Sequence, residues 1–462
     1  MGETKPTVVC MGILDTKGDE IRFLAQEIQR QGADVKIMDL SLGAEASWAD
    51  IRLSQVLEAD GKAKEEVFKS SRSEAAQIVG QAGARKIRAL ADEVRLDGVI
   101  AWGGGMGTSV ATCVMRALPI GFPKIMMSTL ASGDVSKWLG NTDIYIMNPI
   151  AEKGINRITR QIVNTAAGAI VGMAASRRDD TAELRPLAAL TVLGVTTPTV
   201  NRCASFVEEK GWDTIFIHQV GTGATMEDLI RAGEITAVYD ITTGELSNTL
   251  LGSIYGISET WKGERLTAAS EMGIPQVVCP GGLAECAYGA LETMPQSYLD
   301  DFKSGRRVSY QNSGKPYCHS ESVTVLTPTL DETRALALEM ITKLNKTTGP
   351  TAIVVPMRGW SAYDQPKEVA SLERGWPQGK GNAPAWWPEP ENPSWSRRAT
   401  TLWSVFEQNL TASNPNLDVI QCDMHLLDEA FADLLNQCMG DMLEGNWRKG
   451  RYRNTPGVFA SR

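Results

Sequence analysis

Short apolar runs alternate with stretches of helical periodicity along most of this chain, and this alternation limits the fold more than any other feature of the sequence. In the first part of the chain, strands are expected at residues 7–14, 35–40, 98–102, 124–130 and 144–147. Helical periodicity follows them, at residues 19–31, 63–94, 108–118 and 155–176. Strands that alternate with helices form parallel βαβ units, with helices on both faces of the sheet. The pattern therefore predicts an α/β fold with mostly parallel sheets.

The alternation stops at a charged segment, Arg177-Arg178-Asp179-Asp180, and then begins again. The second set of strands is expected at residues 187–195, 214–220, 237–241, 276–279, 352–356 and 417–422. A chain of 462 residues suits two or three domains, at roughly 100–200 residues each. We therefore predict two Rossmann-like domains, at residues 1–180 and 186–462. The second is expected to contain an insertion rich in Trp and Pro at residues 364–398 and to end in a C-terminal helical return.

The charge balance and the cysteines exclude several classes of protein. Lys and Arg number 46 against 55 Asp and Glu, a net charge of −9, whereas general binding of nucleic acid or of an anionic membrane needs a basic surface. The eight cysteines include no Cys-x-x-Cys pair and the chain has three histidines, so structural zinc is not expected. No run of 18 apolar residues and no signal peptide are found, so the expected location is the cytoplasm.

Ligands of parallel α/β sheets bind beside the carboxyl ends of the strands, which makes the polar loops there the first candidates. The loop after the first expected strand contains Asp15, Thr16 and Lys17. Lys17 can reach a phosphate, and Asp15 can bind a metal ion or hold the lysine. An ordinary capped turn at the start of a helix is the alternative.

A glycine-rich run follows the third expected strand and is the strongest candidate for an anion site. It comprises Gly103, Gly104, Gly105 and Gly107, with Thr108 and Ser109 directly after them. Glycines let a backbone approach a phosphate closely, and the amides at the start of a helix attract anions. A tight strand-to-helix turn is the alternative.

Two further loops in the first half carry carboxylates. The first spans residues 128–134 and contains Ser132, Gly133 and Asp134, and the second is Gly140-Asn141-Thr142-Asp143. Either aspartate could face a nucleotide ribose or a metal ion, although both loops are also typical turns. With the two loops described above, they predict a nucleotide pocket in the first domain.

The second half offers residues for chemistry on a substrate, namely His218, Glu245 and Arg358. His218 lies near the end of an expected strand, and histidine titrates in the physiological pH range; a structural histidine is the alternative. Glu245 and Arg358, together with Glu227, are candidate anchors for a small acidic or carbonyl substrate.

Several motifs in one order resemble a single family. They include Gly-Ile-Leu-Asp-Thr-Lys-Gly at 12–18, Gly-Gly-Gly-Met-Gly-Thr at 103–108, Ala-Ser-Gly-Asp at 131–134 and Gly-Ile-Asn-Arg-Ile at 154–158, with second-half segments at 221–230, 239–246, 273–281 and 356–364. In this combination the chain resembles the Tm-one-like ATP-binding family. The resemblance implies two Rossmann-like domains, ATP binding by the first domain, and self-association as a homodimer or higher homo-oligomer. The family's plant member carries a further C-terminal barrel domain, which this chain is expected to lack.

Three functions are consistent with these features. The first is an ATP-dependent or ATP-regulated enzyme acting on a small acidic metabolite, with phosphates at residues 103–109, Lys17 as counter-charge and Mg²⁺ near Asp15 or Asp134. The second is a non-catalytic nucleotide-binding regulator that binds a partner protein. The third is a hydrolase or lyase of a carbonyl compound, with His218 and Glu245 as acid and base.

Overall fold

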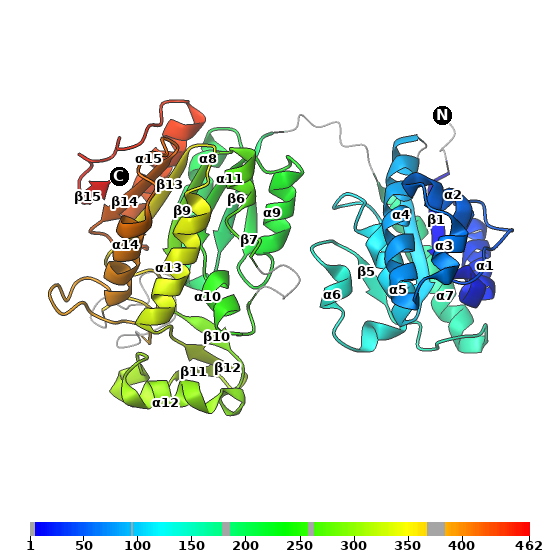
Figure 1. Ribbon diagram of the computed structural model, residues 1–462, viewed down its shortest axis with the longest axis horizontal. Coiled ribbons are helices and arrows are strands. Elements are labelled where there is room, and N and C mark those ends of the chain that lie inside the picture. The colour runs from blue at the N-terminus through cyan, green and yellow to red at the C-terminus, as the bar shows by residue number, and fades with distance from the viewer. Residues whose placement is uncertain (1–4, 94–95, 178–184, 257–262, 367–383) are drawn as a thin grey trace. The chain divides into compact units, whose positions relative to one another are not determined.

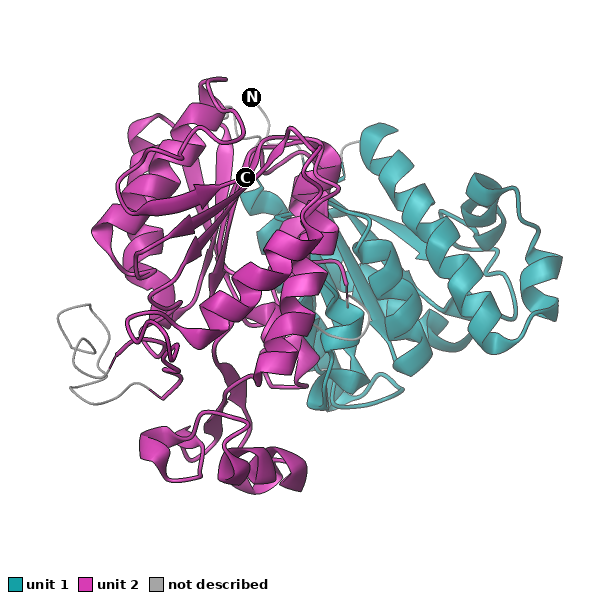
Figure 2. Ribbon diagram, turned by 60° about the vertical axis from the view of Figure 1, so that its left-hand side comes forward, with its two compact units in different colours: residues 1–182 teal, residues 183–462 magenta. Residues whose placement is uncertain are grey.

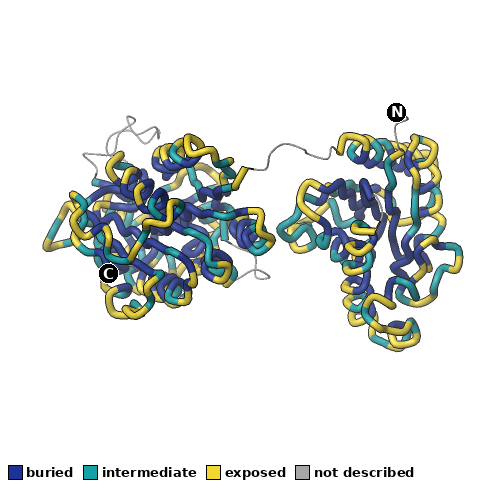
Figure 3. Tube along the Cα trace, turned by 90° about the horizontal axis from the view of Figure 1, so that it is seen from above, coloured by how far each residue is buried: buried dark blue, intermediate teal, exposed yellow. Residues whose placement is uncertain are grey.

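The computed structural model describes residues 5–93, 96–177, 185–256, 263–366 and 384–462 (Figure 1). The chain divides into two compact units, unit 1 at Met1–Ala182 and unit 2 at Glu183–Arg462 (Figure 2). Residues 178–184, which include most of the charged segment expected between the domains, lie outside the described residues. In each unit, buried residues follow the strands and the inner sides of the helices (Figure 3).

Unit 1 contains a five-stranded parallel sheet in the order β2-β1-β3-β4-β5. Its strands are β1 (Thr7–Gly12), β2 (Asp34–Asp39), β3 (Gly98–Gly103), β4 (Lys124–Ser128) and β5 (Tyr145–Met147). The principal helices are α1 (Leu14–Arg30), α4 (Arg72–Glu93), α5 (Gly105–Met115) and α7 (Arg157–Ser176), with the short α2 (Leu53–Leu57), α3 (Lys64–Lys69) and α6 (Ser136–Leu139).

Both faces of the unit 1 sheet are covered, and β1 shows why. Val8 and Cys10 belong to the apolar cluster that includes α1 and α7, whereas Val9 and Met11 belong to the cluster that includes α4 and α5. Successive side chains of a strand point to opposite faces, so a continuous apolar run is typical of a strand buried on both sides.

Unit 2 contains a seven-stranded sheet in the order β15-β14-β13-β9-β8-β6-β7. Its strands are β6 (Leu187–Val192), β7 (Asp213–His218), β8 (Ala237–Thr242), β9 (Gln276–Gly281), β13 (Thr351–Pro356), β14 (Leu417–Cys422) and β15 (Val458–Ser461). All neighbouring pairs are parallel except β14 and β15. The helices that cover this sheet are α8 (Thr197–Glu209), α9 (Gly223–Arg231), α10 (Glu245–Leu250), α11 (Ala268–Met272), α13 (Leu330–Leu344), α14 (Arg397–Asn409) and α15 (Glu429–Leu443).

A small antiparallel sheet in unit 2 was not expected from the sequence. It has the order β10-β12-β11. Its strands are β10 (Cys286–Tyr288), β11 (Tyr317–Ser320) and β12 (Val323–Leu326), with α12 (Gln296–Ser304) between the first two. The sheet projects from the carboxyl ends of the parallel strands (Figure 1).

The α/β class with mostly parallel sheets is confirmed, but three details of the sequence-based prediction are wrong. Helix α1 begins at Leu14, so residues 15–17 belong to its first turn, although the backbone of Lys17 leaves helical geometry (φ −123°, ψ 19°). The helix expected at 63–94 is two helices, α3 and α4. The C-terminal return contains helix α15 but ends in β15, which pairs antiparallel with β14. Among the described residues, no helix has the length and apolar character needed to cross a membrane.

Candidate functional site

The strand order of unit 1 opens a crevice between β1 and β3. After β1 the chain continues to β2 on one side, and after β3 it continues to β4 on the other; ligands bind doubly wound sheets at such a switch point. A hollow of about 400 Å³ lies there. Its walls are formed by Ile13, Asp15, Thr16, Lys17, Arg72, Trp102, Gly103, Gly104, Gly105, Met106, Gly107, Glu152 and Lys153. The structure therefore brings two of the predicted loops, 15–17 and 103–107, to one hollow.

The turn from β3 into α5 requires glycine at one position and leaves open space at another. A Cβ on Gly103 would lie 2.8 Å from the Cα of Gly107, and a clash with backbone is not relieved by side-chain rotation. A Cβ on Gly105 would have Leu130 Cδ1 as its nearest neighbour, at 3.9 Å. The amides in the first turn of a helix have no intrahelical acceptor, so they and the helix dipole favour an anion here.

Lys17 and Glu152 carry opposite charges in the wall of this hollow. Lys17 Nζ lies 3.6 Å from Glu152 Oε1, and the two side chains are 7% and 66% exposed, respectively. The ammonium group also lies 5.9 Å from the centre of the Trp102 ring. Glu152 Oε2 accepts a hydrogen bond from Thr129 Oγ1 at 3.0 Å, and a Cβ on Gly104 would lie 2.7 Å from Glu152 Oε1. A carboxylate thus occupies the space beside the glycine turn and the cation.

The two expected metal ligands are not placed in one hollow. Asp15 lines it, but its Oδ2 accepts hydrogen bonds from Gly43 N at 2.8 Å and Ala44 N at 3.2 Å. Asp134 is not part of the wall; its Oδ1 accepts a hydrogen bond from Ser136 N at 2.9 Å, and this backbone bond lowers the pKa of Asp134. Within the described ranges, no three or more His, Cys, Asp and Glu side chains are grouped to hold a metal ion.

The other residues expected to bind the nucleotide are not part of the wall of the hollow. Thr108 Oγ1 and Ser109 Oγ each donate to the backbone oxygen four residues earlier, at 2.8 and 3.1 Å. Ser132 and Gly133 end the short 3-10 turn after β4. Asp143, of the fourth candidate loop, forms an ion pair at 2.7 Å with the buried Lys124, the first residue of β4. It therefore lies at the amino ends of the strands, away from the hollow at their carboxyl ends.

Six residues of the hollow were not among the predicted site residues, namely Ile13, Arg72, Trp102, Met106, Glu152 and Lys153. Glu152 and Lys153 follow β5, so the rule that sites lie after strands would have pointed to them. Trp102 lies within β3, one residue before the glycine run. Arg72 is the first residue of α4, and no local pattern places a helix start at this hollow.

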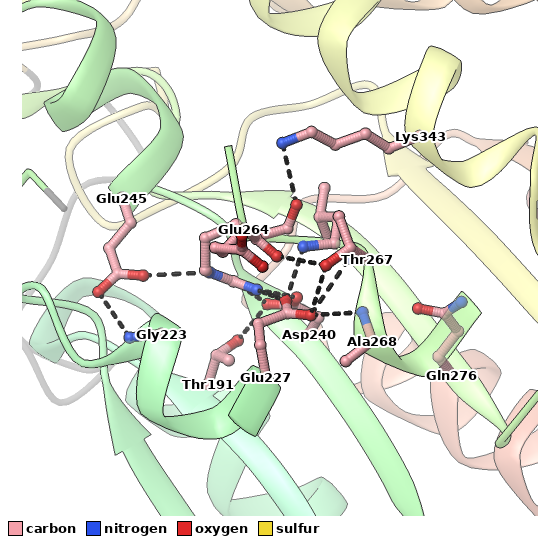
Figure 4. Close-up of polar contacts among 12 residues, drawn as sticks. Thr191, Gly223, Glu227, Asp240, Glu245, Glu264, Thr267, Ala268, Gln276 and Lys343 are labelled. Carbon is pink, nitrogen blue, oxygen red and sulfur yellow. Dashed lines mark hydrogen bonds and ion pairs between the residues drawn. The ribbon is translucent and has the colours of Figure 1, made fainter. Parts of the chain in front are cut away.

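In unit 2, Glu245 belongs to a buried cluster around an arginine (Figure 4). Arg265 Nε donates to Glu245 Oε2 at 3.1 Å. The remaining guanidinium nitrogens donate to Glu227 Oε1 at 3.0 Å and to Asp240 Oδ1 at 2.8 Å. Glu245 Oε1 accepts hydrogen bonds from two amides of the loop 221–223, at 2.7 and 3.0 Å. Burial raises the pKa of Glu245, partly offset by the positive charge of Arg265.

Arg358 also has a structural partner. Its Nε donates to Asp423 Oδ1 at 2.8 Å and its Nη2 to Asp423 Oδ2 at 2.6 Å, a two-pronged pair. Trp395 Nε1 donates to the same carboxylate at 2.7 Å. Part of the expected Trp-rich insertion is therefore packed here, while residues 367–383 of it, including Trp376, lie outside the described residues.

His218 lines a separate hollow of unit 2, about 190 Å³ in volume, at the carboxyl ends of β6 and β7. Its walls are formed by Leu193, Gly194, Val195, His218, Asn248, Tyr255, Glu285, Cys286, Ala287, His319, Val323, Val325 and Tyr363. Glu245 and Arg358 are not among them, so the structure does not unite the three expected catalytic residues. A more open hollow of about 430 Å³ lies by the starts of α8 and α15, where Arg202 and Glu429 already pair at 3.8 Å.

The chain resembles proteins of one family over most of its length. Residues 6–179 match the N-terminal domain, and residues 185–374 the C-terminal domain, of a family described as Uncharacterised protein family (UPF0261). A UPF0261 protein from Clostridium tetani is 34% identical over 366 residues, covering 78% of this chain and 86% of that protein. The ToMV resistance protein Tm-1(GCR237) from Solanum lycopersicum is 30% identical over 385 residues, covering 78% of this chain and 49% of the tomato protein.

Among solved structures, a C2-type ketoreductase from a modular polyketide synthase matches with a TM-score of 0.22 and 12% identity, over 91% of this chain and 81% of that one. Neither fold nor function is inferred from so low a score. The sequence relatives agree with each other and span both units. The chain therefore belongs to the UPF0261 family, with the tomato Tm-1 protein among its homologues.

Proposed function

We propose that unit 1 binds ATP at the crevice between β1 and β3. One observation carries the proposal: the glycine turn 103–107 and the buried cation Lys17, which lie far apart in the sequence, line the same hollow at the switch point of the sheet. Helix amides and a lysine are the groups that recognise phosphate oxygens in proteins. The resemblance to the Tm-one-like ATP-binding family supports ATP as the nucleotide.

The size and charge of the hollow support a nucleoside polyphosphate. Its volume of about 400 Å³ falls within the roughly 300–1,000 Å³ of small-molecule sites. Three cationic side chains line it, Lys17, Arg72 and Lys153, against the carboxylates of Asp15 and Glu152. These two carboxylates are also the groups that could contact a Mg²⁺ ion carried by the phosphates, since hard cations prefer oxygen ligands.

We further propose that the protein is an ATP-dependent or ATP-regulated enzyme that acts on a small acidic metabolite. It would work in the cytoplasm as a homodimer. The alternative is a regulator that binds ATP, and a partner protein, without consuming the nucleotide. Purified protein incubated with ATP and Mg²⁺ separates the two. Phosphate release above background supports the enzyme, whereas binding without turnover, with or without added organic acids, supports the regulator. Light scattering after gel filtration tests the homodimer.

Calorimetric titration with ATP tests the site itself. Lys17→Ala is expected to weaken binding by about 10–100-fold, because a hydrogen bond to a charged group contributes roughly 1.5–3 kcal/mol. The matched control is Lys69→Ala, which removes an exposed lysine at the end of α3 and is expected to leave the Kd unchanged. Equal binding by both variants would place the nucleotide elsewhere.

A further inference from the structure

The switch point of the second sheet carries a hollow of different chemistry, which does not depend on nucleotide binding by unit 1. In unit 2 the chain passes from β6 to β7 on one side and from β8 to β9 on the other. The loop after β6 contributes residues 193–195 to the hollow of about 190 Å³, and α10, which follows β8, contributes Asn248. The end of β7 contributes His218. This is the location at which doubly wound sheets bind ligands.

The small antiparallel sheet covers this hollow. Cys286 and Ala287 come from β10, His319 from β11, and Val323 and Val325 from β12. Because these short strands project from the carboxyl ends of the parallel strands (Figure 1), they form a wall that the large sheet does not supply. Unit 1 has no such sheet among its described residues, so this wall distinguishes the two crevices.

Besides a buried carboxylate, the polar side chains of the hollow include two phenols, Tyr255 and Tyr363, two imidazoles and the Asn248 amide. Tyr363 is 6% exposed and its Oη lies 3.1 Å from His319 Nδ1. The Tyr363 ring packs edge-on against Tyr317 at 6.1 Å between ring centres, which restrains its orientation. His218, at the end of β7, is the second imidazole. The chain has three histidines in all, and two of them therefore meet in this hollow.

The described residues that line the hollow supply no accessible fixed charge. They include no Lys and no Arg, so phosphates and polycarboxylates find no counter-charge on them. The single carboxylate among the described lining residues, Glu285, is 6% exposed, and both of its oxygens are shielded from solvent. The rest of the wall is largely apolar. An uncharged ligand with an apolar body and an oxygen acceptor is the best match, because burying an unpaired charge is costly.

We propose that this hollow binds a small uncharged carbonyl compound, whose oxygen accepts a hydrogen bond from the Tyr363 hydroxyl while His319 Nδ1–H donates to Tyr363 Oη. In this arrangement the imidazole fixes the direction of the phenol proton. Tyr363 contacts the ligand, and His319 is a positioning residue. The hollow is smaller than the roughly 300–1,000 Å³ of sites for drug-sized molecules, so the ligand is a compact one.

Ligand-observed NMR with three probes tests the proposal on the full chain. Cyclohexanone represents uncharged carbonyl compounds, pyruvate a carboxylate, and dihydroxyacetone phosphate a phosphorylated carbonyl compound. Cyclohexanone is expected to show saturation transfer at millimolar concentration, and Tyr363→Phe is expected to weaken its binding by about 5–10-fold, the loss of one neutral hydrogen bond. The matched control is Tyr145→Phe, the same change at an exposed tyrosine of unit 1.

Each alternative outcome contradicts a stated part of the proposal. Stronger binding of pyruvate or of the phosphorylated probe would overturn the ligand class. Equal binding of cyclohexanone by Tyr363→Phe and Tyr145→Phe would overturn the role of the phenol. Val323→Phe fills the hollow from β12 and should abolish the signal with unchanged near-ultraviolet circular dichroism. If wild-type protein shows no saturation transfer, the site does not exist.

Discussion

The first four strands of each large sheet lie in the same order, β2-β1-β3-β4 in unit 1 and β7-β6-β8-β9 in unit 2. The units differ at one junction, the turn from the third strand into the helix that follows it. In each, the third strand in chain order lies beside the first, and a helix begins two residues after that third strand in unit 1 and three residues after it in unit 2. Unit 1 places Gly105 at the helix start, and unit 2 places Glu245 there. The first position faces an open hollow, whereas the second carries a carboxylate turned into a buried ion cluster.

This difference shows how one architecture yields opposite electrostatics. In unit 1 the carboxylate beside the glycine turn belongs to Glu152, whose side chain is 66% exposed. In unit 2 a fully buried carboxylate, Glu245, accepts hydrogen bonds from the loop amides and from Arg265. We therefore expect an anionic ligand to displace Glu152 but not Glu245. Four substitutions, with Glu227→Gln as a milder alternative to the first, test this contrast and the chemistry of unit 2 in order of decreasing expected effect.

Arg265→Met is expected to cause the largest loss. The substitution leaves Glu227, Asp240 and Glu245 buried without their shared counter-charge, and breaking a buried ion pair in this way costs about 3–5 kcal/mol. Urea unfolding followed by circular dichroism measures the free energy of unfolding. The exposed pair partner Lys303 provides the control, because Lys303→Ala should change stability by less than about 1 kcal/mol.

If Arg265→Met does not fold, the same urea unfolding experiment is done with the milder variant Glu227→Gln. It removes one charge of the cluster while the arginine retains two carboxylates, so a smaller loss is expected. A stability equal to that of wild type in either variant would show that the unit 2 junction is not held by this cluster.

Glu285→Gln is expected to change how the stability of unit 2 depends on pH. Burial raises the pKa of Glu285 from 4.5 to about 8, and the nearby negative charge of Asp364 adds to this, whereas the Ser361 hydroxyl opposes it. Between these pH values the folded chain holds a proton that the unfolded chain has lost, so the free energy of unfolding falls as pH rises. From pH 6 to pH 8 the fall is about 2 kcal/mol, at roughly 1.36 kcal/mol per pH unit.

Glutamine cannot lose this proton, so the stability difference between Glu285→Gln and wild type should grow in favour of the variant by that amount over the same interval. Thermal unfolding at pH 6, 7 and 8 measures it. Glu292→Gln, at an exposed position of the same unit, should follow wild type. Parallel curves for all three proteins would mean that Glu285 is ionised in the folded state.

Much of the fold could be predicted from the sequence, because buried parallel strands are short, apolar and separated by helices. β1 is an example, since both of its faces are covered and its run is uninterrupted. The small sheet escaped prediction because β10, with three residues, and β11, with four, are too short to show a period. Strand β15 was not predicted because it pairs antiparallel at the edge of the sheet, and such a strand lacks the alternation of strand and helix that marks a βαβ unit.

The candidate site of unit 1 could be predicted in part for a similar reason. Lys17 and the glycine run follow strands, and strand ends converge in a parallel sheet. Arg265, by contrast, lies in no motif and gains its role only because segments at 227, 240 and 245 meet around it. Glu245 was expected to be catalytic because sequence does not reveal which carboxylates become buried counter-ions.

Gly105→Glu transfers the carboxylate of unit 2 to the junction of unit 1. The space around a Cβ at this position is open, so the fold should persist, while the new charge repels the phosphates. ATP binding is expected to weaken by about 10-fold or more, a like-charge penalty of at least roughly 1.4 kcal/mol. Gly105→Gln is the control of equal size, and calorimetry reports both.

A Gly105→Gln variant that loses as much affinity as Gly105→Glu would indicate a steric effect. Wild-type affinity in the glutamate variant would place the phosphates away from α5, and the comparison between the two junctions would then have no bearing on ligand choice.

Glu152→Gln is expected to have the smallest effect, and one of opposite sign. The Glu152 carboxylate would compete with a bound phosphate for Lys17, and its own side chain is 66% exposed. An ion pair with a solvent-exposed partner contributes about 0–1 kcal/mol. Removing the charge of Glu152 should therefore tighten ATP binding by at most about 5-fold, and the gain should shrink in high salt because exposed charges are screened. Glu65→Gln, an exposed glutamate of α3, should leave the affinity unchanged. Weaker binding in Glu152→Gln only when Mg²⁺ is present would instead make Glu152 a ligand of the nucleotide's metal ion, and its place beside the glycine turn would then serve the bound state rather than oppose it.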